Sequence, residues 1–382
     1  MITSGMNKII KRILLILLVL LPIAGITFHY LYLLPGLTKA FNGDPDWFMK
    51  FMTDTFYPRF PIEKKRFDLS FFLNKANQVI YRFVFIYYLL FFVSYFYKQR
   101  ALFRLKIRNL FYVETTSKNI DVLRIFFLGY FLFVSYELCK SLLLMQPLKP
   151  FYKPILWLKI FNIPFPDSST IITIGVLWYI LTILAILNIR TVLCSGISLF
   201  LFILVQCWIF SFEKIDHSYA TLTYAFILLP FLFDEQKKNN PIFNSWSLQL
   251  IRISIAMVYF LSSLEKIFIS QLSWLKPDTL KTYMDFHETN LSKFIAQYDS
   301  LCILISSGTL LFQLSFILII FLPKYKWFWI IGGILFHTGT LLVMKIGHPL
   351  NPWIVVYIFF IDWTTVYDFF SRRLPKLHLF SN

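Results

Sequence analysis

Charged residues are scarce in this chain of 382 residues, since Asp, Glu, Lys and Arg make up 15% of it while 58% is hydrophobic. Soluble domains carry about 25% charged residues. A chain this poor in polar groups could not cover a water-facing surface, which excludes an ordinary soluble globular protein. Glycine is also scarce, and no tract has low complexity, so the composition argues against long disordered segments. Aromatic residues, by contrast, account for 20% of the chain.

Metal-ligand patterns are absent from the sequence. There is no Cys-x-x-Cys, and the six histidines form no His-x-x-His pair, so we expect no metal site. Haem ligation by His217 and His337 is a remaining alternative. The four cysteines lie in or beside apolar stretches, where we expect them to act as small buried hydrophobes: Cys139, Cys194, Cys207 and Cys302.

The net charge of +17 comes from short basic clusters that separate apolar stretches. Such clusters are typical of membrane loops. Because no basic stripe lies on a soluble helix, we expect no nucleic-acid partner.

Apolar runs of about 20 residues, the length needed to cross hydrocarbon, recur along the chain. They predict an all-α, polytopic transmembrane helix bundle with about 9–10 spans, near residues 13–34, 77–97, 122–145, 169–188, 191–210, 218–233, 248–269, 301–322, 327–347 and 350–370. The first run follows Lys8, Lys11 and Arg12 and lacks a small-residue cleavage site, so we interpret it as a span rather than a signal peptide.

Basic loops predict the orientation. The segments KQRALFRLKIR, DEQKKNN, PKYK and RRLPK all fall on the cytoplasmic side if both termini are inside. The outer segments at 35–76, 147–168 and 270–299 are long enough to fold locally. The WFMKFM stretch of the first predicts an interfacial helix, and the Pro-rich second predicts a surface hairpin or re-entrant piece; ordinary loops are the alternative.

A few ionisable residues lie within or next to the predicted spans. Such residues cost at least ~2.5–3.5 kcal/mol at mid-span, so they point to function. The orientation places His217, Lys266 and His348 on one membrane face, with His337 deeper. Desolvation disfavours a charged amine, and a neutral amine is a competent base. We therefore predict an acid–base site there. The alternatives are a lysine that simply snorkels to water, and a proton-coupled transporter.

Four motifs in this region carry a family resemblance. In chain order, the Pro-rich PFYKPILWLKIFNIPFPD, IDHSYATLTYAFILLPF, IRISIAMVYFLSSLEKIF and the FH-containing GILFHTGTLL resemble the membrane part of vitamin K-dependent γ-carboxylase and its bacterial relatives, the horizontally transferred transmembrane (HTTM) domain proteins. The resemblance covers roughly residues 120–365. It implies N-terminal helices with an outer loop at 1–119, the HTTM domain at 120–370 and a short basic cytoplasmic tail at 371–382.

The resemblance implies an enzyme with Lys266 as the base that acts on a reduced quinone of the vitamin K type, with His217 and His337 as its partners. The family reaction adds oxygen and uses the strong base formed to take a γ-proton from glutamate before CO2 adds. We assign substrate binding to the flanking residues Asp216, Tyr219, Glu265, Trp274 and His348. The expected location is the bacterial plasma membrane, with the site facing outside and a secreted peptide or protein as the partner.

Two departures from the carboxylase bear on its substrate. The double lysine of the carboxylase is Glu265–Lys266 here, and its large lumenal region has no counterpart before Asn382. Capture of a protein substrate by such a region is therefore not expected. Short relatives that help to mature secreted peptide toxins leave a non-catalytic maturation or immunity factor as an alternative. Retained processing in a triple mutant of His217, Lys266 and His337 would favour that alternative.

Overall fold

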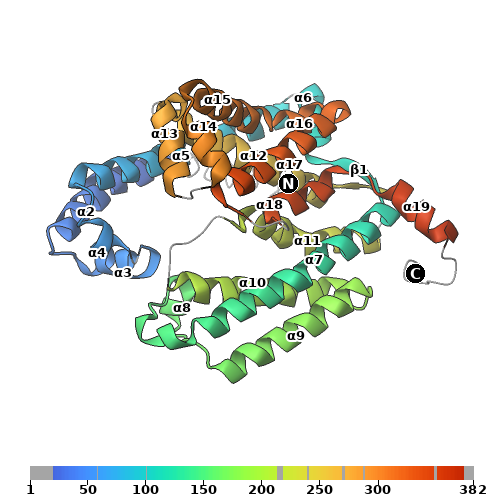
Figure 1. Cartoon of the computed structure of the whole chain (residues 1–382), viewed down its shortest axis with the longest axis horizontal. Helices are drawn as coiled ribbons and strands as arrows, with labels where there is room; N and C mark the ends of the chain where they lie inside the picture. Colours follow the sequence, from blue (N-terminus) through green and yellow to red (C-terminus); the bar gives the residue numbers. More distant parts are fainter. Residues whose placement is uncertain are drawn as a thin grey trace, which may run out of the picture. The chain divides into compact units, whose positions relative to one another are not determined.

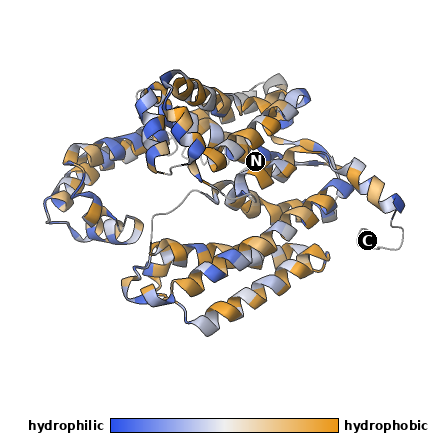
Figure 2. Cartoon of the chain, viewed as in Figure 1, coloured by the Kyte–Doolittle hydropathy of each residue, from blue (hydrophilic) through white to orange (hydrophobic). Residues whose placement is uncertain are grey.

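The computed structural model describes residues 20–57, 59–99, 101–212, 218–238, 241–268, 272–286, 289–347 and 351–373. Helices dominate these ranges (Figure 1), which confirms the predicted all-α, polytopic helix bundle. Figure 2 shows apolar residues along the long helices, as expected for helices that face lipid.

Seven helices in the described ranges are long and apolar enough to cross a membrane: Leu20–Phe41, Leu69–Val93, Ser117–Leu144, Ser168–Ile186, Thr191–Phe210, Trp246–Phe268 and Pro323–Met344. Two further pairs of helices are sharply bent, by 106° between Asn290–Ala296 and Asp299–Ser315 and by 88° between Pro352–Phe360 and Thr364–Arg373. Each would add one span, so nine is the upper count for the described residues. The predicted span at 218–233 is a helix but is not among these candidates, and the one at 350–370 is broken.

The chain divides into two compact units that interleave along the sequence. The first contains Met1–Ile107, Pro147–Phe165 and Cys207–Glu213, and the second contains Arg108–Gln146, Pro166–Gln206 and Lys214–Asn382. The sequence predicted a division into 1–119, 120–370 and 371–382, and that division stays a prediction. Of the predicted tail at 371–382, only residues 371–373 lie in the described part of the chain.

The first unit begins with several short helices, which are followed by the long helix α5. The elements of this unit are η1 (His29–Leu33), α2 (Leu34–Phe41), α3 (Trp47–Phe56), α4 (Phe60–Glu63), α5 (Leu69–Gln99), most of α6 (Ala101–Phe111), most of η2 (Gln146–Phe151) and α8 (Leu156–Ile160). The Asp46 carboxylate accepts from the Met49 amide at 2.8 Å and thereby caps α3. Met49 and Phe72 are buried together, while Trp47 is exposed. The structure thus contains the helix predicted at WFMKFM; its placement at a membrane surface stays a prediction.

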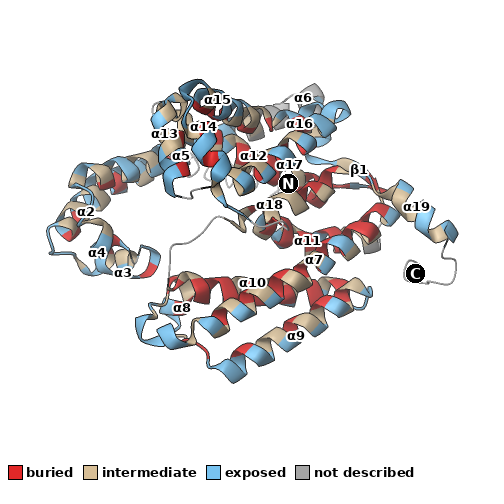
Figure 3. Ribbon diagram, in the orientation of Figure 1, coloured by how far each residue is buried: buried red, intermediate tan, exposed pale blue. Residues whose placement is uncertain are grey.

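The second unit contains the remaining elements. They are β1 (Val113–Thr116), α7 (Ser117–Leu144), α9 (Ser168–Ile186), most of α10 (Thr191–Phe210), α11 (Ala220–Lys238), β2 (Ile242–Ser245), α12 (Trp246–Phe268), η3 (Ser273–Leu275), α13 (Pro277–Phe286), α14 (Asn290–Ala296), α15 (Asp299–Ser315), α16 (Leu318–Phe321), η4 (Pro323–Tyr325), α17 (Lys326–Met344), α18 (Pro352–Val355), η5 (Val356–Phe360) and α19 (Thr364–Arg373). Figure 3 shows many buried residues along α7 and α10.

Aromatic side chains form much of the core of the second unit. Phe131 of α7 contacts Trp178 of α9, Phe202 of α10 and Phe226 of α11, with ring centroids 4.0–5.7 Å apart. All four rings are fully buried. Since lipid is as apolar as these side chains, close ring packing rather than water exclusion holds such helices together.

A two-stranded antiparallel ribbon joins the starts of two long helices and was not predicted from the sequence. Val113 of β1 pairs with Ser245 of β2, and Thr116 pairs with Ile242. Thr116 Oγ1 also accepts from the Asn119 amide and caps α7. Because the strands are antiparallel, α7 begins beside Ile242 and α12 begins beside Val113, at opposite ends of the ribbon.

Glu235 of α11 anchors the start of α12. Its carboxylate accepts hydrogen bonds from Ser245 Oγ at 2.6 Å, from the Trp246 amide at 3.1 Å and from Ser247 Oγ. Both serines are fully buried. We expect Glu235→Ala to lower the free energy of unfolding by about 1–3 kcal/mol, because it leaves buried hydrogen-bond donors without an acceptor. Thermal unfolding in detergent measures this effect. Glu114→Ala, at an exposed position on β1, is the control, and equal melting temperatures would contradict the expectation.

Candidate functional site

A cavity of about 480 Å³ lies within the second unit, between α12, α15, α17 and the start of α18. Ligand pockets are typically about 300–1,000 Å³ and are apolar with a few polar groups. This cavity has that character, since its walls include the rings of Tyr219, Phe336 and Trp353. Its polar lining includes Tyr259, Ser262, Lys266, Gln313, His337 and Asn351.

Lys266 is held in the cavity by neutral groups. Its Nζ donates to Ser262 Oγ at 2.8 Å, one helical turn earlier on α12, and to Gln313 Oε1 of α15 at 3.1 Å. The Nζ atom also lies 5.2 Å from the centre of the Trp274 ring. Among the described residues, no carboxylate forms an ion pair with Lys266. In the described part of the chain, its amine is therefore held in place by uncharged groups.

His337 of α17 is buried and lines the same cavity. Its Nε2 atom lies 2.6 Å from Tyr259 Oη, and that oxygen lies 2.6 Å from Tyr357 Oη. Tyr259 and Tyr357 are almost completely buried, and both stack on Phe316. Three buried polar groups from three elements therefore form one continuous hydrogen-bonded chain.

Gly347 and Asn351 line the cavity together with Trp353. Gly347 adopts φ +105°, a left-handed conformation that glycine accepts without strain. Asn351 is buried, and its side chain accepts from the Trp353 amide at 2.9 Å, which caps α18. The Trp353 ring then lies 5.7 Å from the His337 ring and 5.4 Å from the Tyr259 ring.

The structure brings four of the predicted site residues together. Tyr219, Lys266 and His337 line one cavity, and Trp274 covers Lys266. Glu265 is exposed and does not line the cavity, because neighbouring residues on a helix point in different directions. Asp216, His217 and His348 lie outside the described residues.

Several polar residues of the site were missed in the sequence. Tyr259, Ser262 and Lys266 are spaced at three and four residues, the spacing that places side chains on one face of a helix, so this pattern could have identified the first two. Gln313 and Tyr357 come from other helices, and nothing local in the sequence links them to Lys266 or His337. In the described ranges, no group of three His, Cys, Asp or Glu residues is placed to hold a metal ion.

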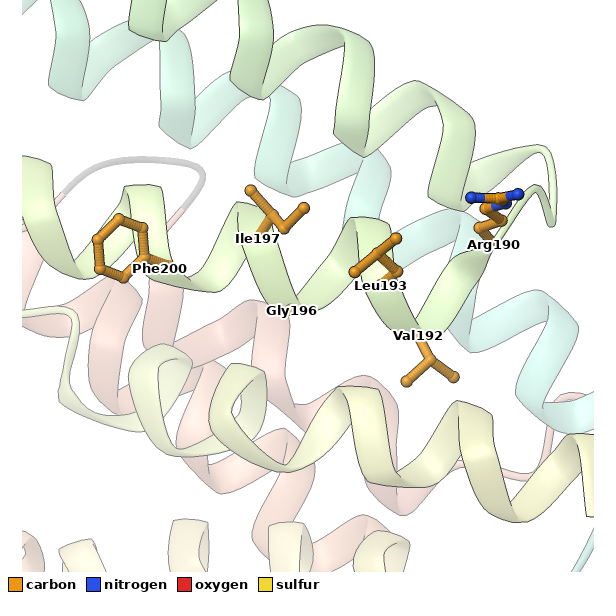
Figure 4. Close-up of a pocket in the computed structure, with 6 residues that line it drawn as sticks. All are labelled: Arg190, Val192, Leu193, Gly196, Ile197 and Phe200. Carbon is orange, nitrogen blue, oxygen red and sulfur yellow. The ribbon is translucent and has the colours of Figure 1, made fainter.

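A second hollow lies along α10 and has a different character. It measures about 580 Å³ and is lined by Arg190, Val192, Leu193, Gly196, Ile197 and Phe200. Figure 4 shows Val192, Leu193, Ile197 and Phe200 along α10, with Arg190 in the loop that precedes it. The groove is open and almost entirely apolar, which suits lipid chains but offers no acid–base pair. The cavity at Lys266 is therefore the candidate site.

Comparisons with protein-family models, with curated proteins and with solved structures find no match for this chain. The fold and the cavity nevertheless define its class. It is a multi-pass, α-helical integral membrane protein with a polar cavity among its apolar helices.

Proposed function

We propose that this chain is a membrane-embedded, carboxylase-like enzyme of the HTTM type, in which Lys266 takes a proton from a reduced quinone. The observation that carries the proposal is the environment of Lys266. An amine that lines a cavity, is hydrogen-bonded only to neutral side chains and has no described counter-ion is placed to act as a base.

The residues around Lys266 suit both of its protonation states. The oxygen of Gln313 accepts a hydrogen bond from the amine or from the ammonium, and the hydroxyl of Ser262 accepts one or donates one. The face of the Trp274 ring attracts a cation. Gln313, Ser262 and Trp274 therefore stabilise the ammonium that forms when Lys266 accepts a proton.

The cavity fits a reduced quinone. Its volume of about 480 Å³ and its aromatic walls match a flat ring, and its polar groups match a pair of hydroxyls. Tyr219, Phe336 and Trp353 would bind the ring, while Lys266 and His337 would face its polar edges. When bound, a reduced quinone supplies an acidic hydroxyl and two reducing electrons. A base among membrane helices is suited to such a lipid-soluble substrate.

The resemblance supports the rest of the proposal. From it we take four parts of the proposal: the site lies in the outer leaflet, the enzyme modifies a secreted peptide or protein, the reaction uses oxygen and CO2, and the membrane is the bacterial plasma membrane. Lys266 and His337, two of the three residues to which the resemblance assigns catalytic roles, both line the cavity, and this agreement supports the link between the motifs and the site.

The direct test is turnover of a reduced quinone by the purified protein in lipid. Lys266→Ala should abolish turnover. Lys281→Ala is the matched control, because Lys281 lies outside the cavity and pairs with Asp299, whose hydrogen bond raises the pKa of Lys281. Equal turnover in wild type and Lys266→Ala would overturn the proposal.

A proton-coupled transporter is the second candidate, and the broken helix next to the cavity favours it. Pro352–Phe360 and Thr364–Arg373 meet at 88°, and Pro352 and Trp353 line the cavity. Transporters often bind substrates at such discontinuous helices. Pyranine-loaded proteoliposomes distinguish the two candidates: proton uptake that depends on an added solute and on Lys266, without quinol oxidation, would favour transport.

A further inference from the structure

The hydrogen bonds from Tyr357 through Tyr259 to His337 allow three arrangements of their protons. In one, Tyr357 and His337 Nε2–H both donate to Tyr259, which is 1% exposed; the Tyr259 proton then has no acceptor among the described residues. The other two arrangements run in opposite directions along the chain. Each link joins two groups that can both donate and accept. In the first direction, Tyr357 donates to Tyr259, and Tyr259 donates to His337 Nε2. In the second, His337 Nε2–H donates to Tyr259, and Tyr259 donates to Tyr357.

Burial decides between the two directions. In the second direction the Tyr357 hydroxyl proton needs a further acceptor, yet Tyr357 is 2% exposed and its hydroxyl has no other hydrogen-bond partner among the described residues. In the first direction both hydroxyl protons are used within the chain. An unpaired buried donor is costly, whereas an oxygen with a free lone pair is common. The first direction is therefore favoured.

The direction fixes the state of the imidazole. If Tyr259 donates to Nε2, that nitrogen carries no proton, and in the neutral ring the proton is on Nδ1. His337 lines the cavity, and Nδ1 has no partner among the described residues. We propose that Tyr357 and Tyr259 act as positioning residues that hold His337 as the neutral Nδ1–H tautomer, with Nδ1–H available to the cavity as a hydrogen-bond donor.

This tautomer gives His337 a role different from that of Lys266. A ring whose only free nitrogen bears a proton cannot accept another proton from the cavity, so His337 does not act as a base. It can instead donate a hydrogen bond to the oxygen that becomes negative when Lys266 accepts a proton. This role rests on the proposed function, whereas the tautomer does not.

Nitrogen-15 magnetic resonance of histidine-labelled, full-length protein in lipid measures the tautomer directly, because protonated and unprotonated ring nitrogens have well-separated shifts. The signal of His337 is assigned by its loss in His337→Gln. We expect wild type, without added quinol, to show a protonated Nδ1 and an unprotonated Nε2. A proton on Nε2, alone or together with one on Nδ1, would overturn the inference.

Two single-hydroxyl deletions test the cause. Tyr259→Phe keeps the ring stacked on Phe316 but removes the donor to Nε2, so we expect the proton to move to Nε2 wholly or in part. Tyr357→Phe removes one buried hydroxyl from the same chain but leaves the Tyr259 donor, so the wild-type tautomer should persist. An unchanged tautomer in Tyr259→Phe, or a changed one in Tyr357→Phe, would contradict the assigned positioning roles.

The tautomer and the proposed function are tested by independent measurements, so either one can be refuted without the other. The magnetic resonance needs no substrate, so a wrong tautomer refutes this inference and leaves the Lys266 result untouched. Conversely, a correct tautomer with full turnover in Lys266→Ala would refute the proposed reaction and, with it, only the anion-stabilising role of His337.

Discussion

Lys266→Arg should reduce turnover of a reduced quinone by about 100-fold or more, as severely as Lys266→Ala, although it keeps the positive charge. A general base contributes roughly 10²–10⁴-fold to a rate. The guanidinium of arginine stays protonated at any physiological pH and cannot accept a proton. Steady-state turnover of the purified variants in lipid, compared with wild type and Lys281→Ala, provides the measurement.

The arginine variant separates base chemistry from charge. If Lys266 only attracted an anion or stabilised the fold with its charge, arginine would retain much of the activity that alanine loses. Loss in both variants, with melting temperatures close to that of wild type, is the pattern expected of a base. Substantial turnover in Lys266→Arg would exclude proton abstraction by this residue.

The spans show how far hydropathy predicts this fold. The run predicted at 191–210 coincides with Thr191–Phe210. A run of twenty apolar residues in hydrocarbon is helical because a helix pairs its backbone polar groups internally. The helix around 218–233 continues instead through Pro230 to Lys238 and is not among the candidate spans. The run at 350–370 breaks between Phe360 and Thr364. Hydropathy sums residue identity over a window, so it does not detect a bend.

The candidate site shows a similar division. Lys266 and His337 could be predicted as site residues because they lie in apolar segments, where an ionisable group is costly. Their partners Gln313 and Tyr357 are uncharged, cost less to bury and carry no such signal. Only the packing of α15 and η5 against α12 brings those side chains to Lys266 and Tyr259.

Among the glycines of the described residues, Gly333 of α17 leaves the least room for an added Cβ atom. Substitution there should therefore have a large effect on stability. A Cβ atom there would lie 2.1 Å from Tyr357 Oη and 2.5 Å from Cζ of the same ring. Tyr357 is buried against Phe316 and Tyr259 and has little room to move. We expect Gly333→Ala to lower the free energy of unfolding by about 1–3 kcal/mol, as overpacking typically does. Thermal unfolding in detergent measures it.

A second glycine and a double mutant make this expectation specific. Gly339 lies on the same helix with nothing within 4 Å of its Cβ position, so Gly339→Ala should be neutral or stabilise α17 by up to about 1 kcal/mol. Tyr357→Phe should relieve Gly333→Ala only partly, because two ring carbons stay within 2.8 Å of the added methyl group. Tyr357→Leu, which removes the ring, should make the double mutant clearly less damaging than the sum of the single changes. Strict additivity of Gly333→Ala and Tyr357→Leu would mean that the methyl group does not meet Tyr357.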